Sequence, residues 1–364
     1  MRGGTTNFSS LLIGLFLFAA ASASAQITLT DQKTAFQPQE FFVADVVDER
    51  LEKSSLGLMV SKDPTGKLSI KAIDLKGGAE KEIERYLTKN YTRNRGSRAS
   101  VLGIKELHLS ESSRTDGMVE GRIRVHFSLG LQKPYGVEPL VSTQYALNYR
   151  RPVANTSSIE GHLRKLFEKA LSHFDEWIKE NANSDSRLAR EVRISFSDYK
   201  DAIEGDTIYY SPNRPLKWAD FQSKNIRVSK YDAVVIPSIG FIQEARAHKS
   251  VVYVEIAMKA YLPKSAAWVR SSAMSYYTLN HEQRHFDIVR IISEQFKQKV
   301  RSANLTPDNY LAFLNMQHLD SLRDLHKMQK AYDDETSHGL NLGAQEKWNK
   351  KIDEELKSIF LASK

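Results

Sequence analysis

Apolar and polar residues alternate in a series of short segments between residue 27 and about residue 150. These segments are rich in β-branched and aromatic residues: FFVADVV, KLSIKAIDL, SVLGIKELHLS, GRIRVHFSLGL and STQYALNYR. A two-residue period sends alternate side chains to opposite faces of an extended chain. The first half of the protein is therefore predicted to be rich in strands.

Two stretches of the first half change to a helical period. The first runs from about Ala79 to Tyr91, and the second opens at Ser157 with a capping-box pattern completed by Glu160. The second stretch places its apolar residues at helical spacing: Ile159, Leu163, Leu166, Phe167, Leu171, Phe174, Trp177 and Ile178. Such a stripe is typical of a helix that packs on a sheet.

The second half repeats the order of strands followed by helices. Strand-like segments run up to the alternating stretch VVYVEIAMKAYL at 251–262, and the remaining chain has helical spacing. This order predicts an α+β domain whose first helix directly follows its sheet. The stretch at 251–262 could be a sheet edge to which an extended peptide adds as a further strand.

A polar, turn-prone segment, ENANSDSR at 180–187, separates the two halves. We therefore predict a strand-rich N-terminal α+β accessory domain over residues 26–183. A second α+β domain is predicted over residues 188–364.

The N-terminus has the features of a secretory signal peptide over residues 1–25. Arg2 precedes the apolar run LLIGLFLFAAA, and Ala23, Ser24 and Ala25 form a small-x-small cleavage pattern. The run is too short to span a bilayer, and no later segment approaches the roughly 20 apolar residues that spanning requires. The expected location is periplasmic or secreted, with cleavage after Ala25 and no transmembrane segment.

Composition narrows the chemistry. The chain has no cysteine, so a metal ion would have to be held by His, Asp or Glu, and disulfides are excluded. The net charge of +8 comes from lysines and arginines scattered among acids, without a basic block or a nucleic-acid-binding motif. We expect no nucleic-acid partner.

The segment HEQRH at 281–285 carries the candidate chemistry. On a helix, His281 and His285 project from one face a single turn apart, so both imidazoles can reach one zinc ion. Glu282 lies beside that face, where a carboxylate can act as general base toward water at the metal. The alternative is a pair of hydrogen-bonded core histidines without a metal.

A catalytic zinc site of this type needs a third protein ligand. Position 291 is Ile, which excludes the metzincin arrangement, and Glu294 follows on the same helix, where it cannot easily turn to the ion. The better source is the segment AYDDETSH, and the first choice there is His338. Glu335 and Asp333 are the alternatives.

Three ordered motifs resemble a bacterial family of predicted secreted zinc-dependent proteases that is classed as a domain of unknown function. They are LKWADF at 216–221, HEQRHFDI at 281–288 and YDDETSHG at 332–339, with Gln345 and Trp348 after them. The resemblance covers roughly residues 190–360.

This resemblance implies a zincin-like fold for the second domain. It also implies that His281, Glu282 and His285 are active-site residues and that His338 is the matching downstream histidine. Tyr332 is a candidate hydrogen-bond donor to the oxyanion that forms when water attacks a carbonyl, although a packed core tyrosine fits its position as well.

The leading functional hypothesis is a zinc metallopeptidase that acts on a peptide or protein substrate, with an envelope partner for the N-terminal domain. A second hypothesis is a non-catalytic envelope protein that retains the zincin fold as a binding scaffold. A third is a metal-dependent hydrolase of a non-peptide amide. The retained Glu282 favours an enzyme, because a purely structural site needs no adjacent base.

Overall fold

The computed structural model describes residues 25–362 apart from residues 33, 202 and 225–230. The chain divides into two compact units, Met1–Glu176 and Trp177–Lys364. The predicted signal peptide lies outside the described residues, except for Ala25. Within the described part of the chain, no helix combines the length and the apolar character needed to cross a membrane.

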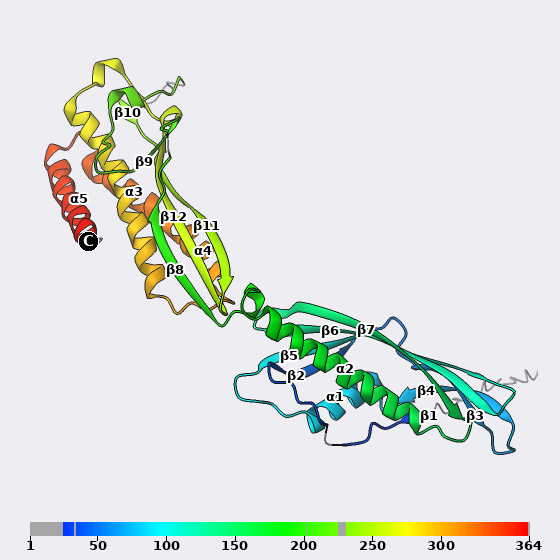
Figure 1. Cartoon of the computed structure of the whole chain (residues 1–364). Helices are drawn as coiled ribbons and strands as arrows, with labels where there is room; N and C mark the ends of the chain where they lie inside the picture. Colours follow the sequence, from blue (N-terminus) through cyan, green and yellow to red (C-terminus); the bar gives the residue numbers. More distant parts are fainter. Residues whose placement is uncertain (1–24, 33, 202, 225–230, 363–364) are drawn as a thin grey trace, which may run out of the picture. The chain divides into compact units, whose positions relative to one another are not determined.

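The N-terminal unit is built on a seven-stranded mixed sheet, shown in Figure 1. Its strands are β1 (Ala25–Ile27), β2 (Phe41–Asp48), β3 (Gly57–Lys62), β4 (Leu68–Leu75), β5 (Arg98–Ser113), β6 (Met118–Lys133) and β7 (Gly136–Pro152). Their order is β1-β4-β3-β5-β6-β7, and β2 pairs in parallel with β5. The long antiparallel strands β5, β6 and β7 confirm the strand-rich prediction.

Two helices cover one face of this sheet: α1 (Ala79–Asn90) and α2 (Ser158–Asn181). Both helices were predicted. The apolar stripe of α2 is buried, and the ring of Phe167 lies 5.5 Å from that of Phe127 on β6. Burial of this stripe against the sheet stabilises the unit.

The predicted capping box of α2 does not form. The Ser157 hydroxyl donates to Asn155 Oδ1. The Glu160 carboxylate instead accepts hydrogen bonds from the Thr30 backbone N–H and from the Arg164 side chain. Glu160 is therefore used to tie the N-terminal segment to α2.

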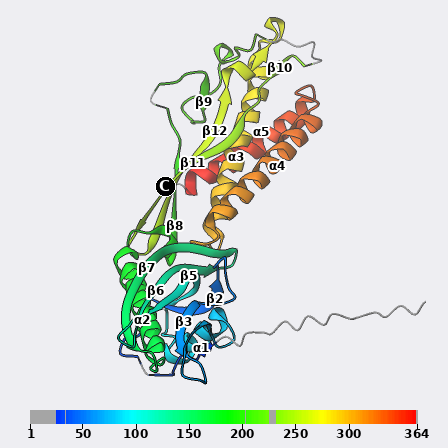
Figure 2. The same ribbon diagram turned by 90° about the vertical axis from the view of Figure 1, so that its right-hand side faces the viewer.

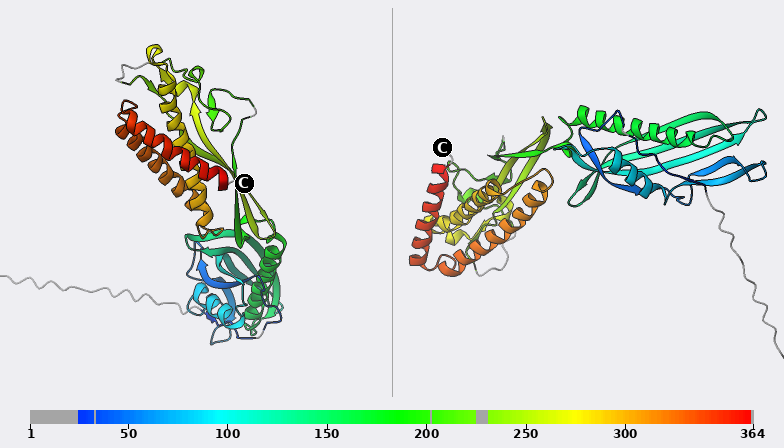
Figure 3. Two further views of the ribbon diagram at one scale, coloured as in Figure 1. Left: turned by 90° about the vertical axis from the view of Figure 1, so that its left-hand side faces the viewer. Right: turned by 90° about the horizontal axis from the view of Figure 1, so that it is seen from below.

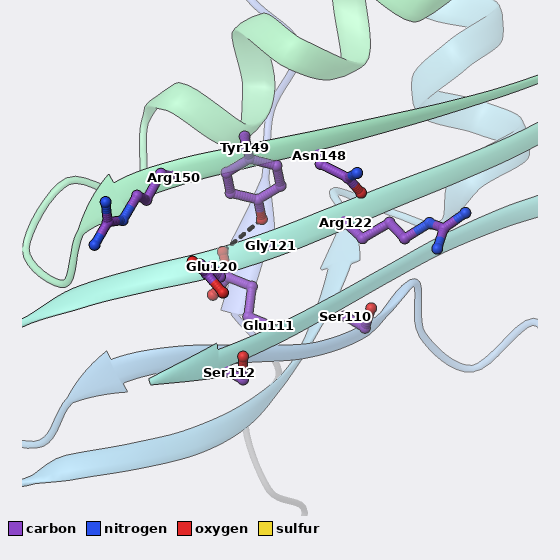
Figure 4. Close-up of a pocket in the computed structure, with 9 residues that line it drawn as sticks. All are labelled: Ser110, Glu111, Ser112, Glu120, Gly121, Arg122, Asn148, Tyr149 and Arg150. Atoms are coloured by element: carbon purple, nitrogen blue, oxygen red, sulfur yellow. Dashed lines mark hydrogen bonds between the residues drawn. The ribbon is translucent and has the colours of Figure 1, made fainter. Parts of the chain in front are cut away.

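The opposite side of β5, β6 and β7 carries polar rows in register. Ser110, Arg122 and Asn148 form one row across the three strands, and Ser112, Glu120 and Arg150 form the next. Figure 4 shows these side chains around a shallow cavity of about 640 Å³.

The C-terminal unit begins with a four-stranded sheet made of β8 (Glu191–Asp198), β9 (Thr207–Tyr209), β11 (Ser238–His248) and β12 (Val251–Pro263). β10 (Ala233–Val234) and β13 (Trp268–Val269) form a separate two-stranded ladder. Short 3₁₀ turns lie at Ser186–Leu188, Trp218–Asp220, Lys264–Ala266 and Ser271–Ala273.

The strand β12 is not a sheet edge, contrary to the expectation for residues 251–262. It pairs with β11 on one side and with β8 and β9 on the other. Its backbone groups are therefore already used within the sheet. The alternating residues do form a strand. Alternation, however, shows only which face of a strand is buried and not whether the strand lies at the edge of its sheet.

Three helices follow the sheet: α3 (Tyr276–Ser302), α4 (Tyr310–Thr336) and α5 (Leu342–Ala362). Figures 2 and 3 show α3 lying along the sheet, with α4 and α5 packed beside it. Val254 and Ile256 of β12 pack with Phe296 of α3 in one buried cluster. A second cluster joins α3 to α4 and α5 around Phe286, Tyr332 and Trp348.

Both units thus have the predicted α+β composition. The boundary between the two units lies between Glu176 and Trp177, within α2, whereas the sequence suggested the polar segment at 180–187. The helix α2 continues to Asn181, so no break in secondary structure marks the division.

Candidate metal centre

The central helix α3 presents both histidines of the motif. Ser275 caps its N-terminus by accepting a hydrogen bond from the Thr278 backbone N–H, which fixes where the helix begins. His281 and His285 then lie one turn apart, with ring centroids 5.0 Å from each other. Both are buried, at 6 % and 8 % exposure.

Asp333, near the end of α4, meets the two imidazoles. Its Oδ1 atom lies 3.0 Å from His285 Nε2 and 3.4 Å from His281 Nε2. Each of these three residues offers one ligand atom, and the three atoms lie within 4.8 Å of one another. The structure therefore brings Asp333, which the sequence offered only as an alternative third ligand, to the two imidazoles.

The distances from Asp333 Oδ1 to the two Nε2 atoms, 3.0 and 3.4 Å, suit ligands of one divalent ion. Ligand atoms held tetrahedrally at about 2.0–2.1 Å from zinc are separated by about 3.3–3.4 Å. Although nitrogen atoms surround Asp333 Oδ1 at hydrogen-bond distance, this buried oxygen has no hydrogen-bond partner of acceptable geometry. Two imidazoles and a carboxylate are also a donor set that zinc accepts.

The electrostatics of the group favour a negative carboxylate at its centre. Burial by itself raises the pKa of a carboxyl, but contacts with His281 and His285 hold the pKa of Asp333 well below its usual range. Burial likewise lowers the pKa of an imidazole, but Asp333 and the charge of Glu282 raise the pKa of His285. The cluster therefore requires compensating positive charge, either a cation or a protonated ring.

Glu282 lies in the same cavity and is only 3 % exposed. Burial raises the pKa of its carboxyl, while His285, His281 and the backbone N–H of Val235 partly oppose the rise. Its Oε2 atom is buried without a hydrogen-bond partner. A carboxylate with a free oxygen beside two imidazoles is the arrangement expected of a group that accepts a proton.

The cavity around these residues has a volume of about 540 Å³. Its lining comes from β10 and its flanks, from the first turns of α3 and from the turn after α4: Tyr231, Asp232, Ala233, Val234, Val235, Tyr277, Thr278, His281, Glu282, His285, Asp333, Ser337, His338, Gly339 and Leu340. Among these described residues there is no lysine or arginine. The cavity thus combines apolar walls with acids and imidazoles.

His338 stands at the edge of the group. Its Nδ1 lies 3.4 Å from Asp333 Oδ1, its ring lies 4.2 Å from that of Tyr231, and its side chain is 37 % exposed. The three ligand atoms grouped above do not include it. His338 therefore faces the cavity next to Asp333, where its role as a ligand stays a prediction.

A tight turn after α4 places His338 there. Ser337, His338 and Gly339 all have positive φ, at 49°, 53° and 83°. A side chain at Gly339 would also contact the His281 ring, because an added Cβ would lie 3.4 Å from its Cγ and Nδ1. The Tyr277 hydroxyl donates to the Gly339 carbonyl at 2.6 Å and so ties the turn to α3.

Tyr332 is fully buried behind the ligands and is not part of the cavity lining. Its ring stacks on His281 at a centroid distance of 4.8 Å. Its hydroxyl donates to the His281 carbonyl and accepts a hydrogen bond from Gln345. These contacts are those of a packed core tyrosine, the alternative that the sequence had left open.

The remaining acidic candidates have other partners. Glu335 accepts a hydrogen bond from the Trp348 indole at 2.8 Å. Glu294, which the sequence made a poor ligand candidate, forms ion pairs with Arg290 and Lys297. Both carboxylates are therefore used in packing the helices.

Two residues near the site were not singled out as functional in the sequence. Gln329 and Gln345 contact the Nδ1 atoms of His285 and His281. Gln345 follows the motif YDDETSHG in the sequence, but a glutamine by itself does not predict a hydrogen bond to a particular histidine. Gln329 lies one turn before Asp333 on α4, a spacing that becomes informative only when Asp333 is known to face the histidines.

No protein-family model and no curated protein sequence matches the chain. Among solved structures, a Xanthomonas campestris protein described under the family model DUF330 is similar at a TM-score of 0.25 and 11% identity, over 42% of this chain and 90% of that chain. A minor lipoprotein from Acinetobacter baumannii is similar at a TM-score of 0.16 and 15% identity, over 28% of this chain and 78% of that chain. Similarity this distant carries no argument about the metal centre.

Proposed function

We propose that the C-terminal unit is a zinc-dependent hydrolase that cleaves peptide bonds. One observation carries the proposal: Asp333 Oδ1 and the Nε2 atoms of two buried histidines converge beside a buried carboxylate, Glu282, that has a free oxygen. Structural sites do not need such a base, whereas hydrolytic sites do.

His281, His285 and Asp333 would hold the ion. When bound, a zinc ion polarises a carbonyl and lowers the pKa of water at the metal toward neutrality. Glu282 is placed to take a proton at Oε2 and to deliver it to the leaving amine.

The charge of the cavity favours a neutral substrate group. Its described lining has no lysine or arginine, although the chain as a whole has a net charge of +8. Phosphoryl transfer sites ordinarily clamp their anionic substrate with such residues. An amide carbonyl, which carries no charge before attack, is a better match, and this applies to both peptide and non-peptide amides.

The proposal includes a zincin-like arrangement, in which α3 follows a sheet and carries the His-Glu-His motif, and a later helix supplies the third ligand. It also includes a secreted or periplasmic location based on the signal-peptide pattern at 1–25. The N-terminal unit, with its polar sheet face, would be the part that docks on an envelope partner.

A second function is favoured by one observation. His338 Nδ1 lies 3.4 Å from Asp333 Oδ1, the spacing expected between two ligands of one zinc ion. If His338 completes a four-ligand set, the ion has no open position and the unit is a zinc-stabilised binding scaffold.

The test compares the purified full chain with Glu282→Gln and, as a matched control, Glu335→Gln, whose carboxylate accepts a hydrogen bond from the Trp348 indole. Zinc content is measured by elemental analysis, and hydrolysis is measured on a mixed peptide library and on cell-wall material by mass spectrometry. We expect zinc in all three proteins and cleavage by the wild type and Glu335→Gln only. Zinc in all three with no cleavage of any substrate supports the scaffold, and absence of zinc from the wild type overturns both functions.

A further inference from the structure

We propose that Gln329 and Gln345 are positioning residues that hold both zinc-binding histidines in the tautomer protonated at Nδ1. Gln345 Oε1 lies 2.9 Å from His281 Nδ1, and Gln329 Oε1 contacts His285 Nδ1. An amide oxygen can only accept, so both Nδ1 atoms must donate. The consequence for zinc binding rests on the proposed function, whereas the tautomer does not.

The orientation of the Gln345 amide is fixed by its other contacts. Its Nε2 atom lies 2.7 Å from the Tyr332 hydroxyl and 2.9 Å from Asn349 Oδ1. Asn349 Oδ1 accepts from Arg284 as well, which identifies it as an oxygen that needs a donor. The amide nitrogen must therefore face this side, and the oxygen is left to face His281.

The Gln329 amide is fixed in the same way. Its Nε2 atom donates to the backbone carbonyl of His285 at 2.9 Å. A carbonyl cannot donate, so reversing the amide would place two oxygens against each other. Gln329 therefore holds both the ring and the backbone of one residue, and this limits rotation of the imidazole.

This arrangement prepares the other side of both rings for a cation. With Nδ1 protonated, the neutral rings present lone pairs at Nε2, and both Nε2 atoms lie within 3.4 Å of Asp333 Oδ1. Two lone pairs and a carboxylate repel one another unless a cation or a proton lies between them. The glutamines thus exclude the tautomer in which Nε2–H groups would satisfy Asp333 without a metal.

Another histidine shows that glutamine contacts do not always act in this way. His126 Nδ1 of the N-terminal unit lies 3.2 Å from the amide nitrogen of Gln144, so there the ring accepts at Nδ1. That pair is exposed, whereas Gln345 is 1 % exposed. A neutral amide also differs from the carboxylate that often supports a metal-bound histidine, because it orients the ring without adding charge.

The experiment uses the full chain with Gln345→Met and Gln329→Met, which remove the acceptor at similar side-chain length. Gln345→Glu restores an acceptor for His281. Gln283→Met is the matched control, because Gln283 lies on α3 and bonds to the Leu216 backbone and to Asp287 but to no imidazole. Two quantities are measured: the ¹⁵N chemical shifts of the imidazoles in zinc-free protein at a pH where the rings are neutral, and the zinc dissociation constant by chelator competition.

In the wild type and in Gln283→Met we expect Nδ1–H tautomers for His281 and His285. Each Met variant should convert its own histidine to a mixture of tautomers and weaken zinc binding by about 10- to 100-fold. Gln345→Glu should keep the Nδ1–H tautomer of His281 and bind zinc within about tenfold of the wild type.

Tautomers that stay at Nδ1–H in both Met variants would overturn the positioning role. So would zinc affinities in the Met variants equal to that of Gln283→Met. A wild type that binds no zinc but shows Nδ1–H tautomers that the Met variants lose would refute the proposed function while upholding the positioning of the rings.

Discussion

Both units bury acidic groups, but the two units differ in how completely these groups are hydrogen-bonded. In the N-terminal unit, Glu111 and Arg151 form an ion pair whose side chains are 0 % and 1 % exposed. The Glu111 carboxylate accepts from the Tyr149 hydroxyl at 2.5 Å, a contact drawn in Figure 4, and from the Val60 backbone N–H. Arg151 also donates to three backbone carbonyls, so the whole group is satisfied.

In the C-terminal unit, the buried atoms Glu282 Oε2 and Asp333 Oδ1 have no hydrogen-bond partner, although the Asp333 side chain as a whole is 27 % exposed. Leaving a buried polar atom unpaired costs about 1–3 kcal/mol, and more for a charged group. Folded proteins retain such unpaired atoms mainly at functional sites, where a ligand or a proton becomes the missing partner. Full pairing indicates a structural role for Glu111, whereas the incomplete pairing of Glu282 and Asp333 supports the proposal that they face a ligand.

The largest expected effect is on catalysis. Replacing Glu282 with glutamine keeps the size of the side chain and removes its ability to accept a proton. Peptide hydrolysis should fall by about 10²- to 10⁴-fold, the usual contribution of general acid–base catalysis. The free energy of unfolding, measured with urea, should stay unchanged or rise, because a poorly paired buried charge is lost. A decrease of several kcal/mol in the free energy of unfolding would instead show that Glu282 has a structural role, as Glu111 does.

The next effect is on stability, in the N-terminal unit. Glu111→Gln leaves Arg151 buried without its counter-charge, which should lower the free energy of unfolding by about 3–5 kcal/mol. The double change Glu111→Leu with Arg151→Met should cost less than the single change. Zinc content should remain that of the wild type. Equal losses in the single and double variants would contradict the interpretation of a paired structural group.

A third prediction separates the two downstream ligand candidates. Asp333→Asn should weaken zinc binding by about 100-fold or more, because it removes the only negative ligand of the group. His338→Ala should weaken it less, since His338 is partly exposed at the rim. Chelator competition measures both. The reverse order would make His338 the third ligand, as the sequence first suggested.

The smallest effect concerns an ordinary ion pair on the surface of the C-terminal unit. Hydrogen bonds from Arg214 and Lys264 lower the pKa of Glu204 to about 2. A lowered pKa stabilises the fold above the ordinary carboxyl pKa of about 4.3, and the contribution is lost as pH falls toward 2. Glu204→Gln should therefore slightly reduce stability near neutral pH and flatten the acid limb of the stability curve. An unchanged acid limb would show that solvent screens the pair completely.

Patterns of apolar residues were enough to predict the main elements. The stripe of α2, the long strands β5 to β7 and the helix carrying His281 were all read from local periodicity, because burial of one face imposes that period. The capping box at Ser157 failed because Glu160 has a distant partner in Thr30. The expectation that residues 251–262 form a sheet edge was wrong for a similar reason, because the neighbours of a strand are set by pairing with distant segments.

The sequence by itself determined that His281 and His285 share a helix face with Glu282 beside them, because helix geometry fixes the relation of residues one turn apart. It also excluded thiolate ligands. Only the tertiary structure decided that Asp333 meets the imidazoles, that Tyr332 packs behind them and that Gln329 and Gln345 hold their Nδ1 atoms. These contacts join α3 to α4 and α5 across 44 to 64 residues of sequence, and such contacts depend on how helices pack, which no local pattern records.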